Sequence, residues 1–437
     1  MTTTDPDAPE PPTSPEPPTA PSEHRPVVDA PVEGVAPVVR RPRQQAAASP
    51  GRSRRRGRRR TTGWWIAATV LFLAALGALG FIGYRSSLKI TGGTPAVTDP
   101  AAPGYVAEVE PTPVQLLAIQ DAAGKLAAAL IVVTDAGGTG GTVISVPAQL
   151  FMPAVDAAPQ ANLADIYAGG GIESLRNRLG TGLGFGFTDA ANVPATEVAA
   201  LAGLIGPITF ENFENLSPAP KLTDPPTDPA ADAVTYRAGQ VTLPPEQIVD
   251  FIGFEGRGEL VDNRGIRQQE VWKTLVDGLK GKNGPATGAL GAAFAAVSAG
   301  DVRFEQLPVA TKPEPNSIFV VTVPDAAAMP AFTARTIAAP VAAYPGQRAR
   351  TRILNGTSSP ASTTFGPTGA VEAGGMISSV GNAESFDVPI TRVEFVSPAA
   401  QPTAAAIATE LGVQATQATT TPAGADVIVV VGADARK

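Results

Sequence analysis

The feature that most constrains this chain is a run of arginines that leads directly into a long uncharged stretch. Seven arginines lie between Arg52 and Arg60, and residues 61–84 carry no charged side chain. The stretch is 24 residues long, and about 20 helical residues cross the hydrocarbon core of a bilayer. Two tryptophans open it and a tyrosine closes it, as is typical of residues at the membrane interface. We therefore expect one transmembrane helix over residues 61–84.

The position of the arginines predicts how this helix is oriented. Cationic residues beside a membrane span remain on the cytoplasmic side, so residues 1–60 should face the cytoplasm and the remainder should lie outside, in the envelope. A cleaved signal peptide would have an apolar core of about 7–15 residues close to the N-terminus, so an uncleaved anchor is favoured. The arginines could also form a nucleic-acid patch. Next to a membrane span, a topology signal with affinity for anionic lipid explains them better.

Composition excludes several kinds of chemistry outside the membrane. The chain has no cysteine, and its one histidine, His24, lies in the predicted cytoplasmic tail. Ser–His and Cys–His mechanisms and imidazole-bound zinc are therefore excluded from the exterior part. Beyond residue 60 the chain carries 22 Lys and Arg against 33 Asp and Glu. An acidic exterior is a poor general binder of polyanions, so we expect no nucleic-acid partner.

The exterior part reads as two α/β units. Ala127–Thr134 and Thr142–Val146 are apolar segments on either side of a Gly-rich turn, which predicts a β-hairpin. No helix and no Gly-Lys-Ser or Gly-Lys-Thr follows this turn, so a phosphate-binding loop is disfavoured. Helical and extended segments then alternate, as in mixed α/β folds. We predict a disordered Pro- and Arg-rich tail (1–60), a transmembrane helix (61–84) and a stalk (85–110). These are followed by a core domain (111–336), a linker (337–348) and a small C-terminal domain (349–437).

Several segments of the exterior part resemble, in the same order, the LytR-CpsA-Psr family of cell-envelope proteins. The core segments are LLAIQDAAGKLAAALIVVTDAGGTGGTVISVPAQLFMP (116–153), ANLADIYAGGGIESL (161–175) and DNRGIRQQEVWKTLVDGL (262–279). Segments similar to the small domain that often follows this core are RTRILNGT (350–357), VGNAESFDVPITRVEF (380–395) and GADVIVVVGAD (424–434). The resemblance implies a phosphotransferase that moves a glycopolymer from a polyprenyl-pyrophosphate carrier to peptidoglycan, usually with Mg²⁺.

Such a reaction needs arginines for the pyrophosphate oxygens and carboxylates to hold the metal or take a proton. Two candidate positions keep the family's residue or its charge in the first segment, namely Asp121 and Lys125, whereas alanine replaces an expected arginine and an expected aspartate. Pro147-Ala148-Gln149 stands where the family has Pro-Arg-Asp. An expected arginine pair is replaced by the neighbourhood of Phe251–Glu255.

The helix at 262–279 is better matched, with Arg264 and Gln268 at the expected places. Asp121, Lys125, Arg264 and Gln268 are therefore our candidates for binding pyrophosphate or lipid, with no catalytic residue assigned and the metal ligands unknown. Each also has a purely structural interpretation. Asp121 can cap a turn, Lys125 can be a solvated surface residue, and Arg264 and Gln268 can be structural hydrogen-bonding groups.

The leading hypothesis is a membrane-anchored envelope protein without the full catalytic machinery, which binds a lipid or a partner protein during cell-wall assembly. It would use no cofactor. The alternative is an active phosphotransferase with Mg²⁺ and a rebuilt site, for which the candidates are Glu108, Glu110, Lys221, Arg257 and Glu259. A DNA-binding regulator has little support, because the cytoplasmic part has no folded recognition element. An open apolar tunnel leading to Arg264 would favour a lipid, and a collapsed one would favour a protein partner.

Overall fold

A computed structural model describes most of the chain beyond residue 96. The described residues are 97–155, 158–219, 233–282, 287–313, 320–358, 367–421 and 423–435. The predicted tail and transmembrane helix, residues 1–84, lie outside them. Among the residues that are described, no helix is long and apolar enough to span a bilayer.

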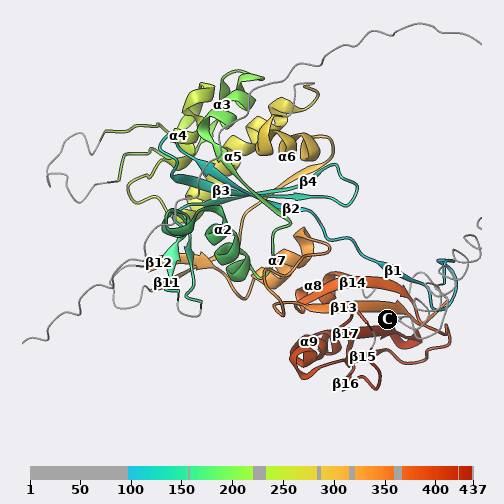
Figure 1. The fold of residues 1–437 in the computed structure, drawn as a ribbon. Coiled ribbons are helices and arrows are strands. Elements are labelled where there is room, and N and C mark those ends of the chain that lie inside the picture. The colour runs from blue at the N-terminus through green and yellow to red at the C-terminus, as the bar shows by residue number, and fades with distance from the viewer. Residues whose placement is uncertain are drawn as a thin grey trace, which may run out of the picture. The chain divides into compact units, whose positions relative to one another are not determined.

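The first unit is built on a five-stranded mixed sheet (Figure 1). The strands run in the order β10 (Val302–Glu305), β4 (Gly141–Pro147), β3 (Leu126–Thr134), β2 (Val114–Gln120) and β7 (Asp189–Pro194). The three central strands are antiparallel neighbours, so the predicted hairpin is confirmed. The two outer strands pair in parallel with their neighbours. The central strands are buried along almost their whole length, because helices cover both faces of the sheet.

Two apolar layers lie on opposite faces of this sheet. One face packs against α3 (Ala195–Gly203), α4 (Ile248–Gly253), α5 (Val261–Leu279) and α6 (Gly288–Ser298). The other packs against α2 (Leu163–Leu183) and α7 (Met329–Thr336), and Figure 1 shows the two groups on either side of the strands. The short remaining elements are β5 (Phe151–Met152), β6 (Ala161–Asn162), β8 (Ile208–Asn212), β9 (Gly239–Leu243), η2 (Pro245–Gln247), β11 (Val309–Pro313) and β12 (Val320–Pro324).

Helix α5 carries an unusual buried stripe. Its buried positions recur at intervals of three and four residues, as expected for a helix with one face on a core. The C-terminal half of the stripe is apolar and includes Trp272, whose ring meets Phe294 edge-to-face with centroids 6.0 Å apart. The N-terminal half contains Arg264, Arg267 and Gln268. Polar side chains thus enter the protein where α5 begins.

The second unit is a six-stranded sheet with two short helices. Its strand order is β1 (Val106–Glu108), β14 (Gly375–Asn382), β13 (Ala349–Asn355), β17 (Val427–Val431), β15 (Arg392–Phe395) and β16 (Ala415–Gln417). Helices α8 (Pro367–Glu372) and α9 (Gln401–Leu411) share its apolar core. Two short 3-10 turns, η4 (Pro398–Ala400) and η5 (Ala433–Ala435), complete it. The prediction of a mixed α/β fold is therefore correct for both units.

One strand differs from the expected organisation. Residues 106–108 were assigned to a flexible stalk, but they form β1 at the edge of the C-terminal sheet. Only three residues form the strand, and two of them are exposed, so the sequence contains no apolar alternation that would have indicated it. The expected linker, residues 337–348, contains no helix or strand.

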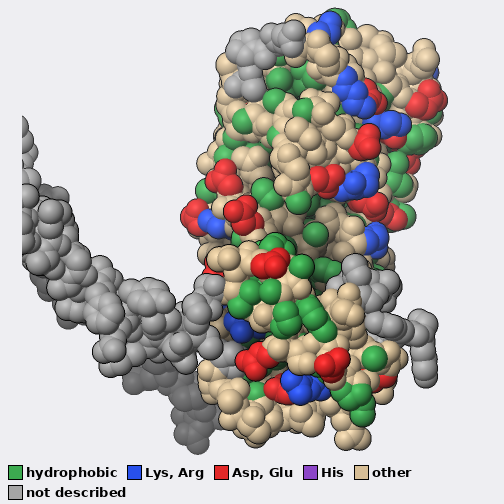
Figure 2. Space-filling view, turned by 90° about the vertical axis from the view of Figure 1, so that its right-hand side faces the viewer, with side chains coloured by type: hydrophobic (Ala, Val, Ile, Leu, Met, Phe, Trp, Pro, Cys, Tyr) green, Lys and Arg blue, Asp and Glu red, His purple; other side chains and the backbone are tan. Residues whose placement is uncertain are grey.

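Charged side chains are mixed on the surface. On the face shown in Figure 2, acidic and basic side chains alternate with apolar ones, and no broad area has a single sign of charge. Nucleic-acid surfaces usually carry a clustered basic patch. This face does not have one.

Candidate functional site

The two candidates in the β2–β3 turn are held by the turn itself. Asp121 Oδ1 accepts hydrogen bonds from the backbone N–H groups of Ala123 (2.9 Å) and Lys125 (2.8 Å). The Lys125 side chain is exposed. The carboxylate of Asp121 therefore stabilises a tight turn, which is the structural interpretation of this residue.

The turn and the start of α5 lie at the same end of the central sheet. Ala128, just after the turn, pairs with Pro147 at the end of β4. Gly265 of α5 packs against Pro147, since a Cβ at Gly265 would lie 3.7 Å from its ring. In the part of the chain that the structure describes, however, Asp121 and Lys125 make no hydrogen bond or ion pair with Arg264 or Gln268. The structure brings the four candidates to one end of the sheet without joining them.

Gln268 is fully buried and both ends of its amide are used. Its Nε2 donates to the carbonyl of Ile252 (2.9 Å), and its Oε1 accepts from Ser145 Oγ (2.9 Å). The indole N–H of Trp272 donates to the same hydroxyl (3.2 Å). This network joins α5 to β4 and α4, so Gln268 satisfies buried polar groups that would otherwise be costly.

An ion-pair cluster occupies the start of α5. The Glu259 side chain is 1% exposed and lies between Arg264 and Arg267. Arg264 Nε is 3.0 Å from Glu259 Oε2, and Arg267 Nε is 2.7 Å from Glu259 Oε1. Arg267 Nη2 adds a third contact to Oε2 at 3.1 Å. One carboxylate thus pairs with both guanidiniums.

The remaining donors of Arg267 are also used inside the protein. Its Nη1 donates to the carbonyl of Phe251, and its Nη2 donates to the carbonyl of Phe254 at 2.9 Å. The guanidinium also lies over the Phe251 ring, 4.8 Å from the centroid. Burial alone raises the pKa of Glu259, but the hydrogen bonds and charges of Arg267 and Arg264 outweigh burial and hold that pKa below its usual range. Glu259 is therefore ionised at neutral pH.

One nitrogen of the Arg264 guanidinium is not bonded to Glu259. Its Nη1 is buried and has no hydrogen-bond partner among the described residues. Arg264 itself is only 4% exposed. A buried donor without a partner needs an explanation, and this atom is the one sign of residual anion-binding capacity in the cluster.

Uncharged and acidic residues lie in the two segments where the family resemblance implies arginines and an aspartate. Gln149 Nε2 donates to Glu255 Oε1 at 2.6 Å, and these residues lie in the two segments where arginines are expected. Within the described ranges, no three acidic or histidine side chains lie close enough together to hold a metal ion. Both oxygens of Glu259 are already bonded to arginines. The Mg²⁺ implied for an active enzyme would therefore find no group of three such ligands among the described residues.

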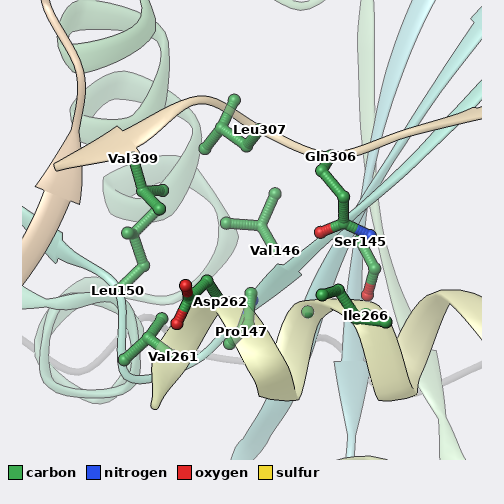
Figure 3. A pocket seen from close by; sticks show the side chains of 11 residues that line it. Ser145, Val146, Pro147, Leu150, Val261, Asp262, Ile266, Gln306, Leu307 and Val309 are labelled. Carbon is green, nitrogen blue, oxygen red and sulfur yellow. The ribbon is translucent and has the colours of Figure 1, made fainter.

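A small apolar pocket lies beside the start of α5 (Figure 3). Val146 and Leu150 line it from β4 and the turn beyond, and Leu307 and Val309 line it from the segment that follows β10. The Asp262 carboxylate also lies on its wall. Its volume is about 140 Å³, whereas pockets for whole organic ligands usually measure about 300–1,000 Å³. Arg264 does not line it, so this pocket is not a tunnel leading to that residue.

A second hollow, also lined by Ile266, is larger, at about 390 Å³. It is lined by Asn212, Phe213, Glu214, Asn263, Ile266 and Arg267. Phe213 is 61% exposed and Ile266 is 40% exposed, and Leu260 at the start of α5 is 60% exposed. Large apolar side chains exposed together mark protein interaction sites. The first turns of α5 thus present apolar groups outside and, inside, an ion-pair cluster in which one carboxylate faces two guanidiniums.

The sequence identified Arg264 and Gln268 as candidates. It did not identify the residues that bind them. Glu259 was only one of the candidates for a rebuilt site, and Arg267 was not singled out although it lies in the segment 262–279 that resembles the family. A glutamate directly before a helix that carries arginines on its buried face was the signal available. Of the other groups considered for a rebuilt site, Glu108 lies in β1 and Lys221 falls outside the described residues.

Comparison with known proteins gives similar folds at low sequence identity. No family model and no curated protein matches the chain. Among solved structures, a LytR-Csp2A-Psr enzyme from Actinomyces oris is 19% identical, with a TM-score of 0.37, covering 53% of this chain and 92% of that one. TagT of B. subtilis is 15% identical (TM-score 0.36; 54% and 90% covered). A LytR-CPS2A-psr family protein, YwtF (TagT), with bound octaprenyl pyrophosphate is 16% identical (TM-score 0.35; 54% and 90% covered).

Proposed function

We propose that this chain is a membrane-anchored envelope protein of the LytR-CpsA-Psr type that acts by binding, without transferring a glycopolymer. It would be held by residues 61–84 with its bulk outside the cytoplasm, and it would take part in cell-wall assembly. The observation that carries this proposal is the buried Glu259 carboxylate, which pairs with both arginines at the start of α5.

The chemical reason is that phosphoryl transfer needs free donors aimed at the charge that develops in the transition state. Every nitrogen of Arg267 is bonded to Glu259 or to a backbone carbonyl. Releasing one partner from a buried ion pair costs about 3–5 kcal/mol. A diphosphate would have to displace Glu259 before it could use Arg267, and Arg264 would offer it only the buried Nη1 that has no partner among the described residues.

The surroundings of α5 favour a protein partner over a long lipid chain. The apolar pocket at this end of the sheet has a volume of about 140 Å³, which suits a single apolar side chain better than a polyprenyl tail. The larger hollow of about 390 Å³ has mostly polar and charged lining residues, including Glu214 and Arg267, which also does not suit a polyprenyl tail. Phe213, Leu260 and Ile266 are exposed around the same turns of the helix. We propose that a cell-wall assembly protein docks on this apolar face, with lipid binding as the less favoured form of the same role.

The test is transfer by the full-length chain from a polyprenyl-pyrophosphate-linked glycan to peptidoglycan, with Mg²⁺ present and an active family member as reference. We expect product at the rate of the protein-free blank. Docking is tested separately by replacing the exposed pair Phe213 and Ile266 with serine. The double variant should lose the partner that cross-links to the unchanged chain at this face, whereas an exposed-site control, Val320→Ser, should keep it.

A second candidate function, an active phosphotransferase, is favoured by the unpartnered Nη1 of Arg264. This candidate predicts transfer at ordinary enzymatic rates that is abolished in Arg264→Ala. Such a result would replace the proposal of a binding protein, because it would show that Arg264 still contacts the diphosphate.

A further inference from the structure

The edge of the C-terminal sheet is completed by a strand that comes from the other end of the exterior chain. β1 pairs antiparallel with β14. Backbone hydrogen bonds extend the pairing beyond the three strand residues, from Gly104 N to Ala383 O (2.9 Å) and from Val109 N to Ser378 O (3.1 Å). The segment before the core therefore acts as the sixth strand of a sheet whose other strands lie more than 200 positions later in the chain.

The receiving edge is shaped for a strand at this place. A Cβ atom at Gly381 would lie 2.0 Å from the carbonyl oxygen of Tyr105, so only glycine permits so close an approach. Next to it, the side-chain amide of Asn382 donates to the carbonyls of Pro100 (2.9 Å) and Ala102 (2.8 Å). Gly381, which has no side chain, and the hydrogen-bonded amide of Asn382 thus define a docking position for an extended segment.

The incoming strand is held mainly by hydrogen bonds. Val106 is 40% exposed and Glu108 is also exposed, and only Val109 at the end of the segment packs against the apolar core of this unit. A typical protein hydrogen bond contributes about 0.5–1.5 kcal/mol net, and segments with few buried apolar contacts open locally at low free energy. When β1 leaves, β14 presents unpaired N–H and C=O groups, which are a template for another strand.

The connection between β1 and the core is short and stiff. Five residues, 109–113, join β1 to β2, and two of them are Pro111 and Pro113. Proline fixes φ and has no N–H group, and short hinges favour exchange of an element between copies of a chain. We propose that β1 is an exchangeable strand and that the β14 edge accepts the same segment from a second copy, which gives a strand-exchanged dimer. This inference does not depend on the chemistry proposed at α5.

The absence of cysteine from the chain makes a direct test available. Ala107 lies opposite Val380, and opposed Cα atoms in an antiparallel pair are about 4.5–5.5 Å apart, within the range of about 4.4–6.8 Å that a disulfide spans. Full-length Ala107→Cys and Val380→Cys chains are mixed, incubated and oxidised. We expect several-fold more covalent dimer from the mixture than from either variant alone. If the mixture gives no excess, and only a doubly substituted chain forms the bond within itself, exchange is overturned.

Matched glycine variants show whether the dimer uses this edge. Gly381→Val, added to the Val380→Cys chain, should abolish the excess dimer, whereas Gly137→Val, where a new Cβ meets nothing within 4 Å, should leave it unchanged. Asn382→Ala removes two hydrogen bonds without filling the edge and should reduce the yield of dimer at an unchanged melting temperature. Dimer that persists at full yield in both edge variants would arise elsewhere and would refute the proposal.

Discussion

At the scale of single residues, Glu259 determines what the arginines of α5 can do. Arg264 and Arg267 are residues of the type that binds phosphate through a planar fork. The Glu259 carboxylate lies between them and is 1% exposed. It bonds Nε of Arg264 and both Nε and Nη2 of Arg267. The same two arginines without Glu259 would form a strong anion site, and with it they form a structural joint at the beginning of the helix.

This ion-pair cluster should contribute a large share of the free energy of unfolding of the first unit. Glu259→Gln removes the negative charge and leaves two buried guanidiniums without a counter-charge. Breaking a buried ion pair by removing one partner costs about 3–5 kcal/mol, and we expect a loss of that size in the free energy of unfolding. Denaturant titration of residues 97–437, followed by Trp272 fluorescence, measures it.

The control for this variant is Glu255→Gln, because Glu255 is exposed and its hydrogen bond is to the neutral amide of Gln149. Exposed substitutions usually change stability by about 0.5 kcal/mol or less. Equal effects of the two substitutions would contradict a special role for the buried carboxylate.

Glu259 also gives the stability a defined dependence on pH. Its pKa is lower in the folded state than the usual value of 4.5, so the folded protein binds this proton less readily than the unfolded chain does. The stabilisation is therefore complete above the unfolded pKa and is lost as pH falls through the folded pKa. We expect the unfolding free energy of the unchanged chain to fall more steeply than that of Glu259→Gln below about pH 4.5. Parallel acid titrations of the two proteins would contradict this linkage.

At the scale of elements, α2 is broken by a glycine pair. Gly170 and Gly171 have non-helical backbone angles inside α2, and Gly171 has φ +63° and ψ −154°. L-residues rarely adopt this conformation. α2 is therefore truly interrupted at the glycine pair, after which the helix resumes.

The break provides a prediction with a control two residues away. Gly171→Ala should lower the free energy of unfolding by about 1–3 kcal/mol, the usual cost of an unfavourable backbone conformation. Gly169 has helical backbone angles and open space around it, so Gly169→Ala should be neutral or stabilising by up to about 1 kcal/mol. Thermal unfolding of the two variants compares them, and a harmless Gly171→Ala would mean that the helix can be continuous.

The elements also show why parts of the fold could be predicted from sequence. The apolar segments of β3, β4 and β17 are continuous and buried, so their pattern was sufficient. Helix α5 spans Val261–Leu279, close to the expected helix at 262–279, and its apolar periodicity starts late because polar residues occupy the first part of its buried face. β1 depends on a partner strand far away in the chain, and no local pattern reveals such pairing.

At the scale of the whole molecule, the site residues that a local sequence pattern marks could be predicted, and those brought in by tertiary packing could not. Arg264 and Gln268 were identified because a motif places them, whereas their partners come from other segments. Glu259 lies before the helix, and Ser145 lies in a strand more than 100 positions earlier. Contacts of this kind are decided by the packing of elements, which sequence periodicity does not encode. The apolar pocket and the exposed groups around α5 have the same origin.

The orientation of the whole chain in the membrane can be tested with the same cysteine-free background. If residues 61–84 form an anchor with the arginines inside, a cysteine at Ala136, exposed in the β3–β4 turn, should react in intact cells with a thiol reagent that cannot cross the membrane. A cysteine at Ser22, in the predicted cytoplasmic tail, should react only after the cells are opened. The reason is that a cationic flank keeps its side of the span in the cytoplasm. Replacing Arg54, Arg55 and Arg56 with glutamine should weaken this preference and increase labelling at Ser22→Cys. Equal labelling of both positions in intact cells, with the arginines unchanged, would show that the anchor or its orientation has been assigned wrongly.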